Sequence, residues 1–360
     1  MNPVASYFKF NPTGAFSVDW YIGKRCNFAC SYCVDYLHDN YSPHVPLENM
    51  IKLADQIIEK NGENIFWSLT GGEPTVNPDF LKLCKYLHSH KPRFTSLTTN
   101  GSRTSAYFKE LFQYIDGITL SFHFEHMEKR IDEYIKKCIE IDDWRKEWNK
   151  NNNGKKTFIL RFMVESGQLK NVEKMENAFR NHGITNIEHR YIRYPTGKPT
   201  ETSEAVNIVS SKDKEAIFRI KNRENNYYKK DEKSKIKNIY DSKITPDKRK
   251  LKFWFLNNEG NYIDKDFHYN ELNFDGKNNY ENWLCWAGVK HLKITPNGDI
   301  YVGSCHVGGR QGNIYDKDSI MLPTEPIRCP KWRCTDNLDL KVPKIKSWNH
   351  YHLIKDMIEC

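Results

Sequence analysis

The chain has 360 residues, of which 38% are hydrophobic and 13% aromatic. This length and composition predict a globular protein with one large domain and a smaller one, and they exclude intrinsic disorder. Apolar runs stay well short of the roughly 18–20 residues that span a membrane, and the N-terminus lacks a secretory signal pattern. We therefore expect a cytoplasmic protein without membrane contact, whose ten cysteines serve metal or redox chemistry instead of disulfides.

The net charge of +9 is concentrated in one segment. Residues 211–252 contain 15 Lys and Arg against 7 Asp and Glu, a local excess of +8, and the rest of the chain is close to neutral. Two interpretations are open: a solvated surface that reflects a Lys- and Asn-rich composition, or a basic lid that attracts an anionic substrate. Aromatic residues do not alternate with these charges in a stacking pattern, which argues against nucleic acid as a partner.

The first part of the chain alternates short β-branched or aromatic runs with amphipathic runs of helical length. The predicted strands are Ser17–Ile22, Asn64–Leu69, Phe94–Thr98, Gly117–Phe122, Thr157–Val164 and Asn186–Ile192. The predicted helices between them are Leu47–Lys60, Asp79–His90, Thr104–Tyr114 and Lys170–Asn181. Strands that alternate with helices predict a parallel α/β sheet of six β/α units, in which functional residues gather at the carboxyl ends of the strands.

The other segments have a different pattern. Residues 124–156 indicate a charged helical insertion, and residues 205–279 a basic, partly helical segment that bridges two domains. The run HLKITPNGDIYV predicts a β-hairpin with its turn at the Pro-Asn-Gly sequence. We therefore expect four parts: a first domain over 1–204, the bridge, a small α+β domain over 280–346 and a closing helix over 347–360.

Three cysteines follow the first predicted strand in the run RCNFACSYC. Cys26, Cys30 and Cys33 have the spacing C-x3-C-x2-C, with no fourth cysteine nearby. Three thiolates this close in sequence can bind three corners of a four-iron cluster and leave the fourth iron open for chemistry. The alternative is a zinc site completed by a distant cysteine or by a histidine such as His38 or His44.

Small and polar residues end the next three predicted strands. The second strand runs into the turn GGEPT (71–75), where the glycines permit a close approach to the backbone and Glu73 offers an acceptor to an ammonium group. The third strand ends in TTNG (98–101) and the fourth in SFH (121–123). These strand ends predict a nucleoside pocket beside the cysteine loop, with His123 and Glu125 as further candidates for substrate contacts.

This order of motifs over residues 15–200 resembles the radical S-adenosylmethionine (SAM) superfamily. The resemblance implies a partial (β/α)6 barrel with a [4Fe-4S] cluster on Cys26, Cys30 and Cys33, whose open iron SAM chelates through its amino and carboxylate groups. It further implies reductive cleavage of SAM to methionine and a 5′-deoxyadenosyl radical, which takes a hydrogen atom from a substrate C–H bond. A flavodoxin- or ferredoxin-type protein is the implied electron donor.

The resemblance also implies which residues contact SAM. The residues carried over by position are Tyr32, Gly71, Gly72, Glu73, Thr99, Ser121 and Arg161. The tyrosine would flank the adenine, the Gly-Gly-Glu run would bind the methionyl amino group, and the residues on the later strands would contact the methionyl or ribose part. The adenine-binding motif that some members carry near the sixth strand is not recognisable in this chain.

Four more cysteines lie in the last 80 residues: Cys285, Cys305, Cys329 and Cys334. Four thiolates from a hairpin and a following loop form a closed tetrahedral site that zinc and a [4Fe-4S] cluster both accept. The stretch C-W-A-G…P-N-G-D-I-Y…C resembles the auxiliary-cluster extensions called SPASM and twitch, and the count of four matches the single cluster of twitch. The resemblance thus implies a second [4Fe-4S] cluster. Of the other cysteines, Cys360 is a further ligand or a free thiol.

Two substrate classes follow from this resemblance. Relatives with one auxiliary cluster oxidise or rearrange small molecules, whereas others cross-link or epimerise ribosomally made peptides. Only 25 residues precede Cys26, too few for a peptide-recognition domain, so we expect a small polar substrate whose radical gives an electron to the auxiliary cluster. A peptide substrate is the alternative. A non-enzymatic zinc or iron–sulfur protein is a remote one, because it leaves the turn at 71–73 unexplained.

Overall fold

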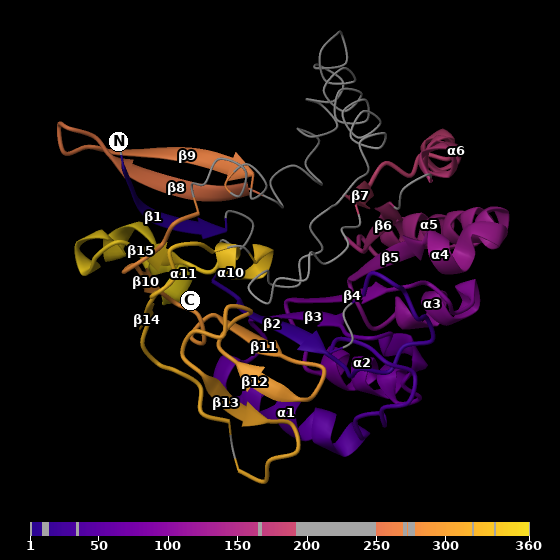
Figure 1. Cartoon of the computed structure of the whole chain (residues 1–360), viewed down its shortest axis with the longest axis horizontal. Helices are drawn as coiled ribbons and strands as arrows, with labels where there is room; N and C mark the ends of the chain where they lie inside the picture. The colour runs from indigo at the N-terminus through magenta and orange to yellow at the C-terminus, as the bar shows by residue number, and fades with distance from the viewer. Residues whose placement is uncertain are drawn as a thin grey trace. The chain divides into compact units, whose positions relative to one another are not determined.

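The structure is a computed structural model that describes residues 2–8, 14–33, 36–164, 168–191, 250–268, 272, 278–318, 320–334 and 336–359 (Figure 1). The chain divides into two compact units. Unit 1 comprises Met1–Trp20, Lys52–Trp67 and Asp231–Cys360, and unit 2 comprises Tyr21–Ile51 and Ser68–Lys230. The division therefore passes through helix α1 (Leu47–Asn61) and strand β3 (Ile65–Thr70), and it falls near the end of strand β2 (Phe16–Tyr21).

Unit 2 is a parallel β/α structure. Its strands follow the end of β3 in the order β4 (Phe94–Thr99), β5 (Gly117–His123), β6 (Thr157–Val164) and β7 (Ile187–Tyr191). Each neighbouring pair from β4 to β7 is parallel. The first six residues of β5 are buried, as expected for a central parallel strand that is covered on both faces.

Helices and short turns connect these strands, and Figure 1 shows the helices along one side of them. They are η1 (Pro74–Val76), α2 (Phe80–Ser89), α3 (Ser105–Leu111), α4 (Phe124–Met127), η2 (Glu128–Arg130), α5 (Ile131–Asn151) and α6 (Leu169–Asn181). The predicted helical insertion at 124–156 is therefore confirmed as α4, η2 and α5. Within the described residues, no helix combines the length and the apolar character needed to cross a membrane.

Unit 1 contains two groups of strands. The first is a six-stranded antiparallel sheet whose strands, in spatial order, are β14 (Ile327–Arg328), β10 (Leu284–Cys285), β15 (Lys344–Ile345), β1 (Asn2–Phe8), β8 (Lys250–Leu256) and β9 (Tyr262–His268). The second runs in the order β13 (Arg310–Asn313), β12 (Asp299–Tyr301), β11 (His291–Ile294) and β2. The predicted hairpin is confirmed as the antiparallel pair β11–β12, and β11 also pairs in parallel with β2.

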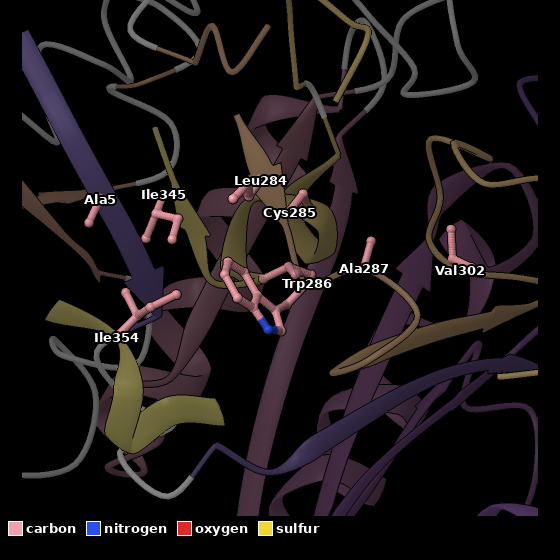
Figure 2. Packing of buried hydrophobic residues seen from close by; sticks show 9 residues of the cluster. Ala5, Leu284, Cys285, Trp286, Ala287, Val302, Ile345 and Ile354 are labelled. Carbon is pink, nitrogen blue, oxygen red and sulfur yellow. The ribbon is translucent and has the colours of Figure 1, made fainter. Parts of the chain in front are cut away.

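A cluster of buried apolar side chains connects the parts of the antiparallel sheet (Figure 2). Trp286 lies in this cluster beside Cys285, with Ala5 of β1 and Ile345 of β15 as further members. Burying a large aromatic side chain of this kind contributes about 1.5–3 kcal/mol to stability. The cluster joins the first strand of the chain to elements near its C-terminal end.

Within the segment 205–279, which was predicted to be partly helical, the structure describes the antiparallel hairpin of β8 and β9, which pairs with β1, and one helical residue, Leu272. Residues 205–249 lie outside the described residues. The C-terminal segment forms a 3-10 turn, η4 (Trp348–Leu353), and one turn of helix, α11 (Lys355–Ile358), instead of a continuous helix. A five-residue helix, α10 (Asn337–Lys341), precedes β15. The expected domain boundaries stay a prediction.

The carboxyl of Asp19 on β2 predicts a pH dependence of stability. Asp19 is buried opposite Lys293 of β11, and burial raises the pKa of its carboxyl to about 7, although Lys293 opposes the shift. A raised folded-state pKa means that the neutral acid stabilises the fold below about pH 4, and that this contribution is lost as the pH rises towards 7. We expect Asp19→Asn to be more stable than wild type at pH 8, by up to about 4 kcal/mol, and equally stable at pH 4. Urea unfolding at pH 4 and pH 8 measures the difference in unfolding free energy between the variant and wild type. The same difference at both pH values would contradict the prediction.

Candidate functional site

The cysteine loop leaves β2 and lies entirely in unit 2. Cys26 and Cys30 are buried and Cys33 is half-buried. The loop is held by backbone hydrogen bonds, from Cys26 N to Asp39 O at 2.7 Å and from Cys33 N to Cys30 O at 3.0 Å. The Asp39 carboxylate accepts hydrogen bonds from the backbone amide and hydroxyl of Ser42 and thereby closes the far end of the loop. These contacts hold the loop at the start of the β/α structure.

The turn after β3 packs directly against this loop. Gly72 N donates to Gly23 O and Glu73 N donates to Arg25 O, both at 2.9 Å. A Cβ atom on Gly72 would lie 2.1 Å from Lys24 O, and Gly71 has a φ of +129° that disfavours other residues. From the sequence, these glycines are expected to leave room for a ligand. The structure shows a second reason for them, because the neighbouring backbone already occupies that space.

Glu73 connects the ends of β3 and β4. Its carboxylate accepts hydrogen bonds from the amide and hydroxyl of Thr75, from the hydroxyl of Thr99 at 2.7 Å and from Asn100 N at 2.6 Å. The side chain is 2% exposed, and this burial raises the pKa of its carboxyl despite the hydrogen bonds. Glu73 and Thr99, both predicted SAM contacts, are thus brought together, and their polar atoms already bind each other.

Asn100 is a site residue that the sequence analysis did not single out. Its side-chain amide donates to Asn27 Oδ1 at 2.9 Å and lies 4.0 Å from the Cys26 sulfur. It therefore links the Glu73 carboxylate to the cysteine loop. Its place in the TTNG strand end was the available signal, but nothing in the sequence showed that its side chain turns towards the cysteines.

Two groups after β5 reach the cysteine loop from the other side. His123 Nδ1 lies 2.6 Å from the Tyr32 hydroxyl and 3.4 Å from the Cys30 sulfur. Burial lowers the pKa of His123 to about 4, so the imidazole is neutral at pH 7. Glu125 accepts hydrogen bonds from the amide and hydroxyl of Ser31 at 2.9 and 3.2 Å. Both candidates therefore contact the loop itself.

The other predicted SAM contacts are on β5 and β6. Ser121 is buried and is the register partner of Arg161. The guanidinium of Arg161 pairs with the Glu188 carboxylate of β7 at 3.0 Å. Tyr32 is buried, and its ring is parallel to that of His123, with ring centroids 6.1 Å apart, as its hydroxyl contact with Nδ1 requires. The roles of these residues towards SAM stay predictions.

The three cysteines offer the donor set of a [4Fe-4S] cluster, which needs three protein thiolates when one iron is left open. Among the described residues, the one set of three potential ligands within 4.8 Å of one another is Cys30, Glu125 and His126. Burial raises the pKa of Cys26 to about 11 and of Cys30 to about 12, so metal binding must displace their protons.

Comparison with known proteins finds a family match for part of the chain. The sequence pattern of the radical SAM superfamily matches residues 20–147, which include the three cysteines and the Gly-Gly-Glu turn. The chain therefore contains a radical SAM domain. The predicted resemblance is confirmed over these residues, and Glu73, Asn100 and the cysteine loop lie inside this domain.

Two curated relatives and one solved structure show how far this chain resembles known proteins in sequence and in fold. The GTP 3′,8-cyclase of Nautilia profundicola is 34% identical over 94 residues, which is 25% of this chain and 29% of that protein. The Haemophilus influenzae enzyme of the same name is 37% identical over 89 residues, 23% of this chain and 25% of that protein. The structure of anSMEcpe with bound AdoMet matches 83% of this chain and 78% of its own, with a TM-score of 0.52 and 16% identity. This likeness confirms the fold class.

Outside the radical SAM domain, the second set of cysteines lies in unit 1. Cys285 belongs to the apolar cluster around Trp286, and Cys334 packs against a second cluster that contains Tyr280 and Trp283. Two of the four cysteines are fixed by backbone hydrogen bonds, from Cys329 N to Trp283 O and from Cys334 N to Asn278 O. Their four thiolates form a donor set that zinc and a [4Fe-4S] cluster both accept.

Charged groups are buried beside these cysteines. The Asp339 carboxylate accepts hydrogen bonds from Ser304 N at 2.9 Å and from Cys305 N at 2.7 Å, and thereby fixes the Cys305 backbone. Lys344 is the antiparallel register partner of Cys285. Burial raises the pKa of the Cys305 thiol to about 12, to which Asp339 adds. Neither charge could be assigned to the cysteine set from the sequence, because only the fold shows that their side chains are buried.

Proposed function

We propose that this protein is a radical SAM enzyme that reductively cleaves SAM and abstracts a hydrogen atom from a substrate C–H bond. The observation that carries the proposal is one connected set of polar groups. Cys26, Asn100, Glu73 and Thr99 are linked through contacts of 2.6–4.0 Å from the cysteine loop across the ends of β3 and β4. An isolated cysteine metal site would not need this arrangement at the carboxyl ends of parallel strands.

The chain's residues would hold, orient and shield the reactants. Cys26, Cys30 and Cys33 would ligate a [4Fe-4S] cluster, which when bound supplies the electron that breaks the sulfur–carbon bond of SAM. The exposed atoms of the Gly71–Glu73 turn would hold the methionyl amino group. Tyr32 would flank the adenine, while Thr99, Ser121 and Arg161 would line the ribose and methionyl parts. The buried, neutral His123 would pack against Cys30 and Tyr32 without adding a charge of its own.

The second set of cysteines supports a reaction in which the substrate is oxidised. One electron cleaves SAM to methionine and a 5′-deoxyadenosyl radical, which takes a hydrogen atom and becomes 5′-deoxyadenosine. A substrate radical that then loses one electron and one proton becomes a product oxidised by two electrons. We propose that an auxiliary [4Fe-4S] cluster on Cys285, Cys305, Cys329 and Cys334, in the predicted domain 280–346, accepts that electron. Four thiolates are a common ligand set for such a cluster.

The proposed substrate is a small, polar and anionic molecule. The curated relatives are named GTP 3′,8-cyclase, and GTP is itself a small, polar and anionic molecule. The basic segment 211–252 would attract such an anion. The electron donor would be a flavodoxin or ferredoxin. A ribosomally made peptide is the alternative substrate, and acceleration of 5′-deoxyadenosine release by peptides but not by anionic metabolites would favour it.

The test separates the two cysteine sets. Anaerobically reconstituted wild type should hold about eight irons and, with reductant, release 5′-deoxyadenosine and methionine from SAM. Cys334→Ala should hold about half the iron and still release 5′-deoxyadenosine, but form little oxidised product from any substrate that accelerates the release. Iron analysis and chromatography of both products measure this.

Cys84→Ala is the matched control, since Cys84 is fully buried in α2 and burial raises the pKa of its thiol. It should change neither iron content nor product. Wild type that binds iron but never cleaves SAM would refute the proposed function. Full product formation by Cys334→Ala would refute the electron-acceptor role alone.

A further inference from the structure

The side chain of Lys344 is a buried positive charge in unit 1. It is 1% exposed. Its ammonium donates hydrogen bonds to two backbone carbonyls, Asp339 O at 2.5 Å and Val342 O at 2.9 Å, and lies 4.9 Å from the centre of the Tyr280 ring. Among the residues that the structure describes, no carboxylate forms an ion pair with it. A buried ammonium without a counter-charge is strongly unfavourable, so this position calls for an anion.

The anion that the structure offers is the cysteine set. Lys344 on β15 lies directly opposite Cys285 on β10, and register partners in an antiparallel pair project to the same face about 4.5–5.5 Å apart. The nearby Asp339 carboxylate is already engaged by the amides of Ser304 and Cys305. The ammonium charge therefore lies on the face of the sheet that carries Cys285, whose sulfur would be a thiolate once a metal is bound.

We propose that Lys344 compensates the negative charge of the auxiliary cluster and raises its reduction potential, which makes that cluster the electron acceptor. The inference rests on the proposed function, because it requires a cluster on these four cysteines. Reduction adds one electron and one unit of negative charge to a cluster held by four thiolates, with no bond made or broken. A fixed positive charge beside it stabilises the reduced form more than the oxidised form, and net charge is a main determinant of cluster potential.

The experiment is a redox titration of the full-length, reconstituted protein followed by electron paramagnetic resonance. SAM binds the cluster with the open iron and changes its signal, so the signal that SAM leaves unchanged reports the auxiliary cluster. Lys344→Met should keep about eight irons. At a fixed potential, the ratio of reduced to oxidised auxiliary cluster should fall about tenfold. For a one-electron couple, this corresponds to a midpoint potential about 59 mV more negative than that of wild type.

Lys355→Met is the matched control, because Lys355 pairs with Glu359 at the exposed surface and its loss removes the same charge. Its midpoint should equal that of wild type. An unchanged midpoint in Lys344→Met with full iron content would overturn the inference and leave the proposed function intact. Wild type with about four irons and no SAM-insensitive signal would instead refute the auxiliary cluster, and the inference with it.

Lys344→Met could lose the cluster outright, and a charge-conserving variant then decides. Lys344→Arg keeps the positive charge, so it should retain the cluster and a midpoint close to that of wild type. Loss of the cluster in both variants would show that the shape of the lysine, not its charge, is required, and would overturn the inference.

Discussion

Joint replacement of Cys26, Cys30 and Cys33 by alanine should abolish the release of 5′-deoxyadenosine from SAM. These cysteines would provide all the protein ligands of the SAM-cleaving cluster. Without the cluster nothing delivers an electron to the sulfur–carbon bond, so the activity should fall to the detection limit. About half of the eight irons should remain on the second set.

The measurement is iron content and 5′-deoxyadenosine in the same preparation. Joint replacement of Cys84 and Cys138 is the control, since both thiols are buried in helices of the same unit and have no role in the proposed chemistry. Residual SAM cleavage in the triple variant would show that the cysteine loop is not the cluster site. An unchanged iron count would have the same meaning.

Gly72→Ala should strongly weaken SAM binding, because the new methyl group would meet the backbone of the cysteine loop. Its Cβ would lie 2.1 Å from Lys24 O and 2.5 Å from Arg25 O, and backbone atoms cannot move aside as a side-chain end can. Overpacking costs about 1–3 kcal/mol. The turn after β3 would separate from the loop, and SAM binding should weaken by about tenfold or more.

Gly23→Ala provides a control from the same pair of segments. Its Cβ would meet only Val45, at an ordinary contact distance of 3.9 Å. Equilibrium binding of SAM to the reconstituted proteins distinguishes the two variants. Equal SAM affinity in Gly72→Ala and wild type would show that this turn does not hold the methionyl group.

Unit 2 could largely be predicted from the sequence because its signals are local. The strand β6 has the predicted bounds, and the polar strand ends that follow β3, β4 and β5 were visible as short motifs. The contacts of Asn100 could not be predicted, since the direction of a side chain depends on how two strand ends meet. The same holds for Glu73, whose carboxylate is engaged by its neighbours in a way that the motif does not reveal.

Unit 1 was less predictable because its pairings are distant in sequence. β8 and β9 lie in or beside a segment whose composition is dominated by lysine, and charge obscured their alternating pattern. Lys344 reads as an ordinary surface lysine, and only the register of β15 against β10 places it beside Cys285. Register between two-residue strands leaves no periodic signal in the sequence.

The discontinuous construction of unit 1 has a consequence for biosynthesis. β1 pairs with β15 and β8, and β2 pairs with β11, so the earliest strands of this unit find partners that the ribosome makes last. Until residues 250–345 emerge, these strands present unpaired edges, which favour chaperone binding and aggregation. Unit 2 has no such delay, because its strands β4 to β7 pair in order of synthesis. Premature termination before β15 should therefore yield insoluble chains, not a smaller working enzyme.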